Sequence, residues 1–434
     1  MMEPFLYFIL FVICLLVLLA TGLPVAVAMG VLGIFGTFIF VGPNALTQLG
    51  VIAFNQSSSM ALLVVPLFVF MGETLAISAI GTNLFRTAQL WLGRLPGALG
   101  IGTILASTGF SAVTGSSPVT AATIGSIAVP EMVKNGYDRK LALGATAAGG
   151  TLGILIPPSI PMILYGIITE TSIGALFMAG ILPGLMIALL LSITVVIKTA
   201  LSSNRAEAAV VNILWKDRIR SLISVIPVLV LGIVVLGSIY MGVATPTESG
   251  ALGAAGAFLL ILLTGYFAFN TFKKVLENTV KTTAMFLLLL IGGLFSSFFL
   301  NLLGIPQGMA NFITSLNVSP WAIIICINIL LLILGMFIDP MSILVIIIPL
   351  FFPTVMNLGF DPVWFGIMVT INIEIAAITP PVGFNLFILK SVVEDVTLSE
   401  VIRGSLIFII PLVVGLILII LFPDIALFLP SIMR

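Results

Sequence analysis

The chain has 434 residues, of which 60% are hydrophobic and only 7% are charged, and its mean hydropathy is +1.33. Because soluble globular domains carry about 25% charged residues, this composition excludes a water-soluble fold and indicates a polytopic membrane protein. Sixteen basic and sixteen acidic residues cancel, so no nucleic-acid partner is expected, and the absence of histidine removes the usual general base and metal ligand. Cys14 and Cys326 lie far apart in apolar runs, so no disulfide framework is expected either.

The apolar runs of the first half predict one structural unit over residues 1–200. In chain order we expect scaffold helices, an amphipathic interfacial arm, a re-entrant hairpin, and a broken helix with the helix after it, at residues 1–80, 82–95, 97–133 and 141–198. The scaffold includes a span at 51–73. The hairpin is predicted because its two apolar halves meet at a polar tip, Thr114-Gly115-Ser116-Ser117-Pro118, and neither half is long enough to cross the bilayer.

The second half repeats this order after a cytoplasmic linker at 201–221, within a unit at 222–434. We expect scaffold helices, an arm, a hairpin, a broken helix and a last helix at residues 222–303, 306–318, 320–356, 362–390 and 404–422. The second hairpin has its tip at Asp339-Pro340, and the broken helix is interrupted at Pro380-Pro381.

Glycine and proline positions indicate an internal duplication. At a fixed shift of 223 residues, nine Gly or Pro positions coincide, where roughly three are expected by chance from their frequencies. They include Gly136 with Gly359 and Pro157-Pro158 with Pro380-Pro381. Each copy has five crossings, and an odd number turns the second copy upside down in the membrane, as in secondary transporters with inverted repeats.

The placement of positive charge tests this topology. With the N-terminus outside, all but one of the Lys and Arg residues fall on a single side of the membrane: Arg86, Arg94, Lys134, Arg139, Lys140, Lys198, Arg205, Lys216, Arg218, Arg220, Lys273, Lys274, Lys281, Lys390 and Arg403. Only Arg434 lies opposite. By the positive-inside rule this side is cytoplasmic. We therefore expect an all-α protein of two inverted repeats in the bacterial inner membrane, with both termini periplasmic.

Four helix starts lie in the middle of apolar runs. A proline preceded by a hydroxyl or carboxyl cap marks such a start at Ser117-Pro118, Asp339-Pro340 and Thr379-Pro380, and Pro157-Pro158 takes the matching place in the first half. Lipid cannot satisfy the free backbone groups at these breaks. We expect the breaks to face a hydrated cavity, with carbonyls suited to a cation and N–H groups suited to an anion. The alternative is a set of simple proline kinks.

Residues at the breaks are the expected contacts of a substrate carboxylate or hydroxyl. They are Ser117, Ser159, Asp339, Pro380 and Asn385. The role of Asp339 stays open between a cation ligand, a protonated acid and a helix cap, and Glu374 between ion coordination and a structural role. The glycines Gly144, Gly149, Gly150 and Gly153 permit close helix packing.

The sequence contains no phosphate-binding loop and no Ser-His-Asp set, so neither ATP hydrolysis nor covalent catalysis is expected. The chain is therefore interpreted as a transporter and not as an enzyme. A downhill ion is the remaining source of energy. Without histidine, Na⁺ held by carbonyl and hydroxyl oxygens is more natural than a proton relay.

Several stretches resemble one family. The run TGSSPVTAATIG at 114–125, GILIPPS at 153–159, ATPTE at 244–248 and ITPPVG at 378–383 are similar to the large membrane subunit of TRAP transporters, the tripartite ATP-independent periplasmic systems. The resemblance covers nearly the whole chain. It implies a Na⁺-coupled elevator, in which hairpins and broken helices move against a scaffold. It also implies a small membrane subunit of about four helices and a soluble periplasmic protein that delivers an organic acid, such as sialic acid or a dicarboxylate.

The same resemblance implies two or more Na⁺ ions. One site falls on Thr114, Ser116, Gly153, Ile156 and Pro157, and the other on Gly335, Ala376, Thr379 and Val382. Ala376 stands where the family more often has glycine, which matters little if only the backbone carbonyl binds. The alternative function is a stand-alone Na⁺/dicarboxylate symporter of related fold that needs no soluble partner.

Overall fold

The computed structural model describes residues 2–93, 95–201, 214–315 and 318–433, which form helices without any strand among them. The expected all-helical fold class is confirmed. The helices of the first half are α1 (Met2–Ala20), α2 (Val25–Phe40), η1 (Pro43–Ala45), α3 (Leu46–Ser57), η2 (Met60–Leu63), α4 (Val64–Ala76), α5 (Ile80–Leu92), α6 (Ala98–Thr114), α7 (Ser117–Lys134), α8 (Arg139–Thr151), η3 (Leu152–Ile154), α9 (Ile160–Thr169) and α10 (Ile173–Leu201).

The second half follows the same order. Its helices are α11 (Trp215–Tyr240), α12 (Pro246–Leu263), α13 (Phe269–Leu302), α14 (Ile305–Ser315), α15 (Pro320–Gly335), α16 (Pro340–Asn357), α17 (Pro362–Ala377), α18 (Phe384–Val392), α19 (Leu398–Leu421) and α20 (Asp424–Ile432). Among the described residues, six helices are long and apolar enough to cross a membrane, or up to seven if the bent pair Pro43–Ser57 and Met60–Ala76 is one span.

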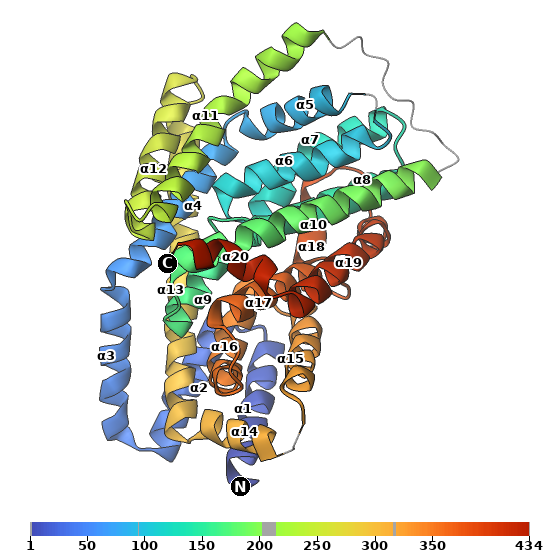
Figure 1. Cartoon of the computed structure of the whole chain (residues 1–434). Coiled ribbons are helices and arrows are strands. Elements are labelled where there is room, and N and C mark those ends of the chain that lie inside the picture. The colour runs from blue at the N-terminus through green and yellow to red at the C-terminus, as the bar shows by residue number, and fades with distance from the viewer. Residues whose placement is uncertain (1, 94, 202–213, 316–317, 434) are drawn as a thin grey trace.

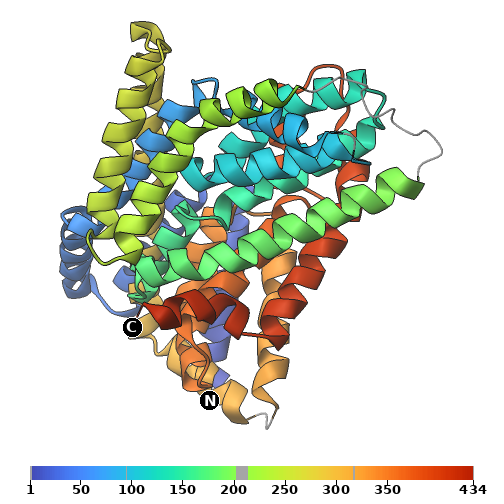
Figure 2. The ribbon, with the colours of Figure 1, turned by 45° about the horizontal axis from the view of Figure 1, so that its top comes forward.

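The two helical hairpins lie in opposite halves of the molecule. Helices α6 and α7 contact each other in the upper half of Figure 1, and α15 and α16 contact each other in the lower half. The long helix α10 runs diagonally across the front of Figure 2 and contacts α19 and α20. The opposite orientation of the two units in the membrane stays a prediction.

Some observed bounds differ from the sequence expectations. The span expected at 51–73 is bent by 51° between α3 and α4. Ser57 and Ser58 cause the bend, because their hydroxyls donate to the carbonyls of Ala53 and Phe54, each at 2.7 Å, and such bonds compete with helix continuation. The repeat boundaries themselves stay a prediction.

Other differences concern helix ends. Helix α10 continues to Leu201 and α11 already begins at Trp215, so part of the expected linker at 201–221 is helical, while 202–213 lie outside the described residues. Helix α19 begins at Leu398, earlier than expected, because Thr397 and Glu400 form a capping box there. Helix α20 was not expected.

Matched residues play matched roles in the two halves. Asp138 caps α8 by accepting from the N–H of Lys140 at 3.0 Å, and Asp361 caps α17 by accepting from the N–H of Val363 at 2.7 Å. Gly136 and Gly359, each two residues earlier, both have positive φ angles, of +79° and +82°. The members of each pair are 223 residues apart, which is the shift found in the sequence.

Glycine permits the closest helix contacts, as the sequence indicates. A Cβ at Gly144 of α8 would lie 2.0 Å from the carbonyl oxygen of Gly404 in α19, and a Cβ at Gly150 would lie 2.6 Å from the Cβ of Ala121 in α7. Lipid tails are as apolar as leucine, so helix association in a membrane depends on such close packing. Helix α8 is thereby held between the first hairpin and α19.

The contact of α8 with α19 predicts that Gly144→Ala destabilises the protein by about 1 to 3 kcal/mol, because the new methyl group has to push two backbones apart. Gly237→Ala in α11 is the matched control, since nothing lies within 4 Å of its added Cβ. Thermal melting of the purified protein in detergent measures both. Equal melting temperatures for the two variants would contradict the packing.

Candidate functional site

The tip of the first hairpin consists of two residues between α6 and α7. Gly115 has φ +60°, and its N–H donates to the carbonyl of Ser111 at 3.0 Å, which closes α6. Ser116 is extended, and Pro118 at the start of α7 has no N–H to leave unsatisfied. A side chain at Gly115 would strike the carbonyl oxygen of Pro158 at 2.1 Å, so only glycine fits here. The tip therefore lies directly against the break between α8 and α9.

The first helix break begins at η3 and ends at Ser159. The hydroxyl of Ser159 accepts from the N–H of Met162 at 3.4 Å and donates to the carbonyl of Ile154, so this side chain caps α9. The N–H of Ile160 donates to the carbonyl of Gly115 at 3.4 Å. One backbone hydrogen bond thus fastens the hairpin tip to the break.

The first implied Na⁺ set is brought together here. A Cβ at Gly153 would lie 2.6 Å from the carbonyl carbon of Ser116, and Ile156 and Pro157 form the following segment of the break. The hydroxyl of Thr114 donates to the carbonyl of Phe110 at 3.0 Å, and Ser116 makes no side-chain cap bond. Backbone carbonyls and two hydroxyls therefore lie in one small region.

The second hairpin repeats this geometry with different residues. The N–H of Val382 donates to the carbonyl of Met336 at 3.2 Å, which fastens the tip between α15 and α16 to the break between α17 and α18. A Cβ at Gly335 would lie 2.4 Å from the Cβ of Ala376. The hydroxyl of Thr379 donates to the carbonyl of Ile375 at 2.5 Å. The residues of the second implied Na⁺ set are thus also gathered.

A buried side-chain pair joins the two halves of the chain. Ser117 at the start of α7 and Asn385 in α18 are almost fully buried, and the Asn385 Nδ2 lies 2.7 Å from the Ser117 Oγ. The Asn385 amide also donates to the carbonyl of Ala147 in α8, at 3.5 Å. Two of the expected substrate contacts are therefore neighbours, and in this conformation they bind each other.

The other three expected substrate contacts lie outside the Ser117–Asn385 pair. Asp339 accepts from the N–H groups of Met341 and Ser342, each at 3.1 Å, so of the three roles left open for it the structure displays the helix cap. Ser159 caps α9, as described, and Pro380 lies partly buried in the second break. No single contact joins all five residues.

Two buried asparagines, one in α15 and one in α17, were not singled out from the sequence. Asn372 donates to the side-chain oxygen of Asn328, and Asn328 donates to the carbonyl of Ile324 at 2.7 Å. The sequence feature that could have indicated them is an asparagine within each of two apolar helices. Glu374 is fully buried, and both of its carboxyl oxygens lack a hydrogen-bond partner.

The arrangement suits ion and solute binding better than catalysis. The C-terminal ends of α6, η3, α15 and α17 direct carbonyl groups toward the breaks, and the N-terminal ends of α7, α9, α16 and α18 direct N–H groups there. Within the described residues, no group of three His, Cys, Asp or Glu side chains could hold a metal ion. Opposed hairpins packed on broken helices define a helical membrane transporter fold.

Comparison with known proteins specifies the family. The family described as "Tripartite ATP-independent periplasmic transporter, DctM component" matches residues 12–425, and the chain belongs to this family. The C4-dicarboxylate TRAP transporter large permease protein DctM of Pseudomonas aeruginosa is 37% identical over 92% of this chain and 93% of its own length. The sialic acid TRAP transporter large permease protein SiaM of Vibrio cholerae is 32% identical over 86% and 87%.

A solved structure supports the fold. The YdaH transporter of Alcanivorax borkumensis, described as having an unusual topology, superposes with a TM-score of 0.65 over 87% of this chain and 88% of its own, at 16% sequence identity. The chain is thus a large permease of the TRAP transporter family, with the fold of a membrane transporter.

The Ser117–Asn385 pair predicts a measurable coupling. Ser117→Ala, Asn385→Ala and the double variant should show an interaction free energy of about 1 kcal/mol in unfolding, because each single change leaves a buried partner unsatisfied. Ser126→Ala is the matched control on α7, since this exposed hydroxyl donates only to the carbonyl of Thr123. Additive effects of Ser117→Ala and Asn385→Ala would contradict a shared hydrogen bond.

Proposed function

We propose that this permease imports a small organic acid across the bacterial inner membrane, coupled to Na⁺, by elevator-type alternating access. The observation that carries the proposal is the pair of backbone links from hairpin tip to helix break, Gly115 to Ile160 and Met336 to Val382. Each link makes a hairpin and a broken helix one unit. Such a unit can move without exposing its backbone ends to lipid.

Sodium is the co-transported substrate of this proposal. Na⁺ prefers oxygen ligands, and each gathered set offers carbonyls at a helix C-terminus together with a hydroxyl, from Ser116 in one and Thr379 in the other. Both hydroxyl oxygens keep lone pairs for a cation, because Thr379 uses only its hydrogen on Ile375 and Ser116 forms no cap bond. Two or more ions are expected.

The solute is proposed to be a carboxylate. The N-terminal ends of α7, α9, α16 and α18 all begin at the breaks and favour negative charge. The similar large permeases named above act in systems for C4-dicarboxylates and sialic acid, which are organic acids. Ser117, Ser159, Asp339, Pro380 and Asn385 line the starts of these helices and are the proposed contacts.

The moving unit is proposed to contain both hairpins and both broken helices. Ser117 and Asn385 bind across the two halves, and Gly144 of α8 packs on Gly404 of α19, so these elements hold together. The scaffold would then consist of α1–α5 and α11–α14. Helix α5 is the amphipathic arm expected at 82–95, and α14 takes the place of the arm expected at 306–318.

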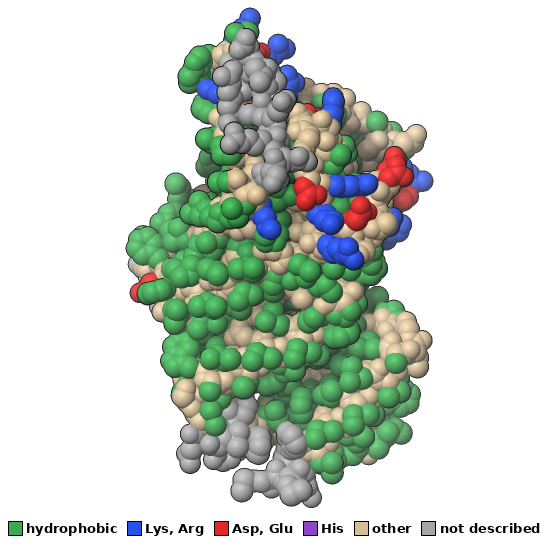
Figure 3. Space-filling model, turned by 90° about the vertical axis from the view of Figure 1, so that its right-hand side faces the viewer, with side chains coloured by type: hydrophobic (Ala, Val, Ile, Leu, Met, Phe, Trp, Pro, Cys, Tyr) green, Lys and Arg blue, Asp and Glu red, His purple; other side chains and the backbone are tan. Residues whose placement is uncertain are grey.

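Orientation and partners complete the proposal. Lys and Arg side chains gather at one end of the molecule in Figure 3, while the remaining face is largely hydrophobic. We assign that end to the cytoplasm and both termini to the periplasm. A small four-helix membrane subunit and a periplasmic substrate-binding protein are the proposed partners, as the name tripartite implies.

The Na⁺ sites predict a specific change in transport. Ser116→Ala and Thr379→Ala should each raise the Na⁺ concentration for half-maximal uptake by about tenfold, which corresponds to the loss of roughly 1.4 kcal/mol of binding free energy. Thr379→Ser should restore the wild-type value, because a hydroxyl returns. Uptake by reconstituted liposomes over a range of Na⁺ concentrations measures this, with Ser126→Ala as control. An unchanged Na⁺ dependence in both alanine variants would refute the sites.

Reconstitution also separates the tripartite system from a stand-alone symporter. Liposomes with both membrane subunits should accumulate the organic acid only when the cognate periplasmic protein is added. Replacing external Na⁺ with choline should abolish this uptake. Equal uptake by the large permease alone, without any soluble protein, would support the stand-alone alternative instead.

A further inference from the structure

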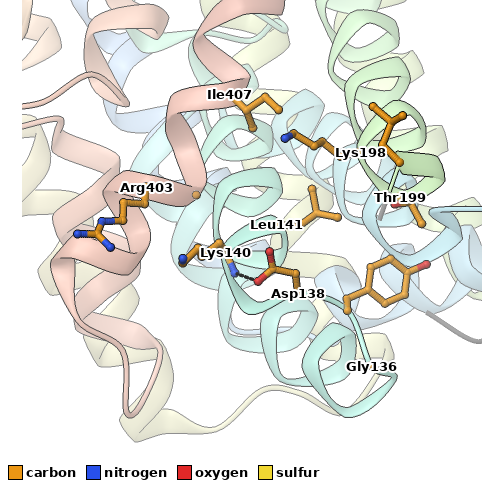
Figure 4. A pocket seen from close by; sticks show the side chains of 11 residues that line it. Gly136, Asp138, Lys140, Leu141, Lys198, Thr199, Arg403 and Ile407 are labelled. Atoms are coloured by element: carbon orange, nitrogen blue, oxygen red, sulfur yellow. Dashed lines mark hydrogen bonds between the residues drawn. The ribbon is translucent and has the colours of Figure 1, made fainter. Parts of the chain in front are cut away.

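A pocket outside the proposed transport site opens at the basic end of the molecule. Its volume is about 350 Å³, and it is lined by the loop before α8 with the first turn of α8, by the end of α10 and by the first half of α19. In Figure 4, Leu141 lies between Lys140 and Lys198, and the Arg403 side chain extends away from Lys198. Three elements distant in sequence thus contribute one cation each.

The positive charge of this pocket is incompletely compensated. Of the residues that the structure describes, Asp138 is the one acidic side chain that lines it, and its carboxylate accepts from the N–H of Lys140 as the cap of α8. Glu400 lies close enough to interact electrostatically with Lys140, but its carboxylate is engaged in the capping box with Thr397. Among the described residues, neither Lys198 nor Arg403 forms an ion pair.

The helices that form the pocket walls continue into apolar, exposed surfaces. On α19, Leu406 and Ile410 lie three and seven residues after Arg403, on the same helix face, and are 47% and 64% exposed. On α10, Ile197 precedes Lys198 and is 51% exposed. A basic pocket whose wall helices also carry exposed apolar residues is complementary to a phospholipid, which has an anionic headgroup and acyl chains.

We propose that this pocket binds the headgroup of an anionic phospholipid of the inner leaflet. Its phosphate would lie between Lys140 and Lys198, with Arg403 adding positive charge from α19, and its acyl chains would lie along α10 and α19. The assignment to the inner leaflet rests on the proposed orientation of the permease. Because α8 and α19 belong to the proposed moving unit and α10 contacts both, the lipid would bind that unit itself.

Lipid titration of the purified protein tests the proposal without any transport assay. In native mass spectrometry, phosphatidylglycerol should bind at least about tenfold more tightly than phosphatidylcholine. Lys140→Gln combined with Lys198→Gln should remove most of this preference, since basic residues at a membrane surface attract anionic headgroups. Arg403→Gln alone should reduce it.

The control for the double pocket variant removes two lysine charges outside the pocket. Lys274→Gln combined with Lys281→Gln alters two exposed lysines of α13 that do not line the pocket, and it should keep the preference. The proposal fails if the wild type binds both lipids equally, or if the pocket variants keep their preference. Complete displacement of phosphatidylglycerol by millimolar inorganic phosphate would also overturn it, in favour of a free-anion site. Na⁺-driven uptake is measured separately, so failure here leaves the proposed function intact.

Discussion

The structure depends on one constraint: backbone groups freed at helix ends within a membrane must find partners inside the protein. At each hairpin tip, a backbone carbonyl accepts a hydrogen bond from a backbone N–H of the neighbouring helix break. The carbonyl of Gly115 accepts from Ile160, and the carbonyl of Met336 accepts from Val382. Side chains supply further partners, because Ser159 caps α9 and Asp339 caps α16. The remaining carbonyls at these ends are the groups that the proposal assigns to a cation.

Close packing also holds the hairpins and the broken helices together. Glycine at positions 115, 144 and 153 lets backbones approach within distances that any side chain would prevent. The buried contact between Ser117 and Asn385 then ties the first hairpin to the second broken helix. The two breaks are consequently connected through packed helices, which is what the proposed coupling of Na⁺ binding to the movement of a solute requires.

The breaks could be predicted from the sequence, because proline and its preceding cap act through local chemistry. Ser117-Pro118, Asp339-Pro340 and the two Pro-Pro pairs all lie at or beside observed helix interruptions. The bend at Ser57 was missed, since an apolar run with three serines reads as a single span. The Ser117–Asn385 and Asn328–Asn372 contacts depend on how distant helices pack, and neither partner's own sequence neighbourhood encodes the other.

The central claim is that sodium binds where the hairpin tips meet the helix breaks. A high-resolution cryo-electron microscopy map of the purified permease in NaCl, paired with one in choline chloride, tests it most directly. The account predicts ion density beside Ser116 and Gly153, and beside Gly335 and Thr379, in the sodium map alone. Saturating sodium without density at either position, or with density elsewhere, would contradict it.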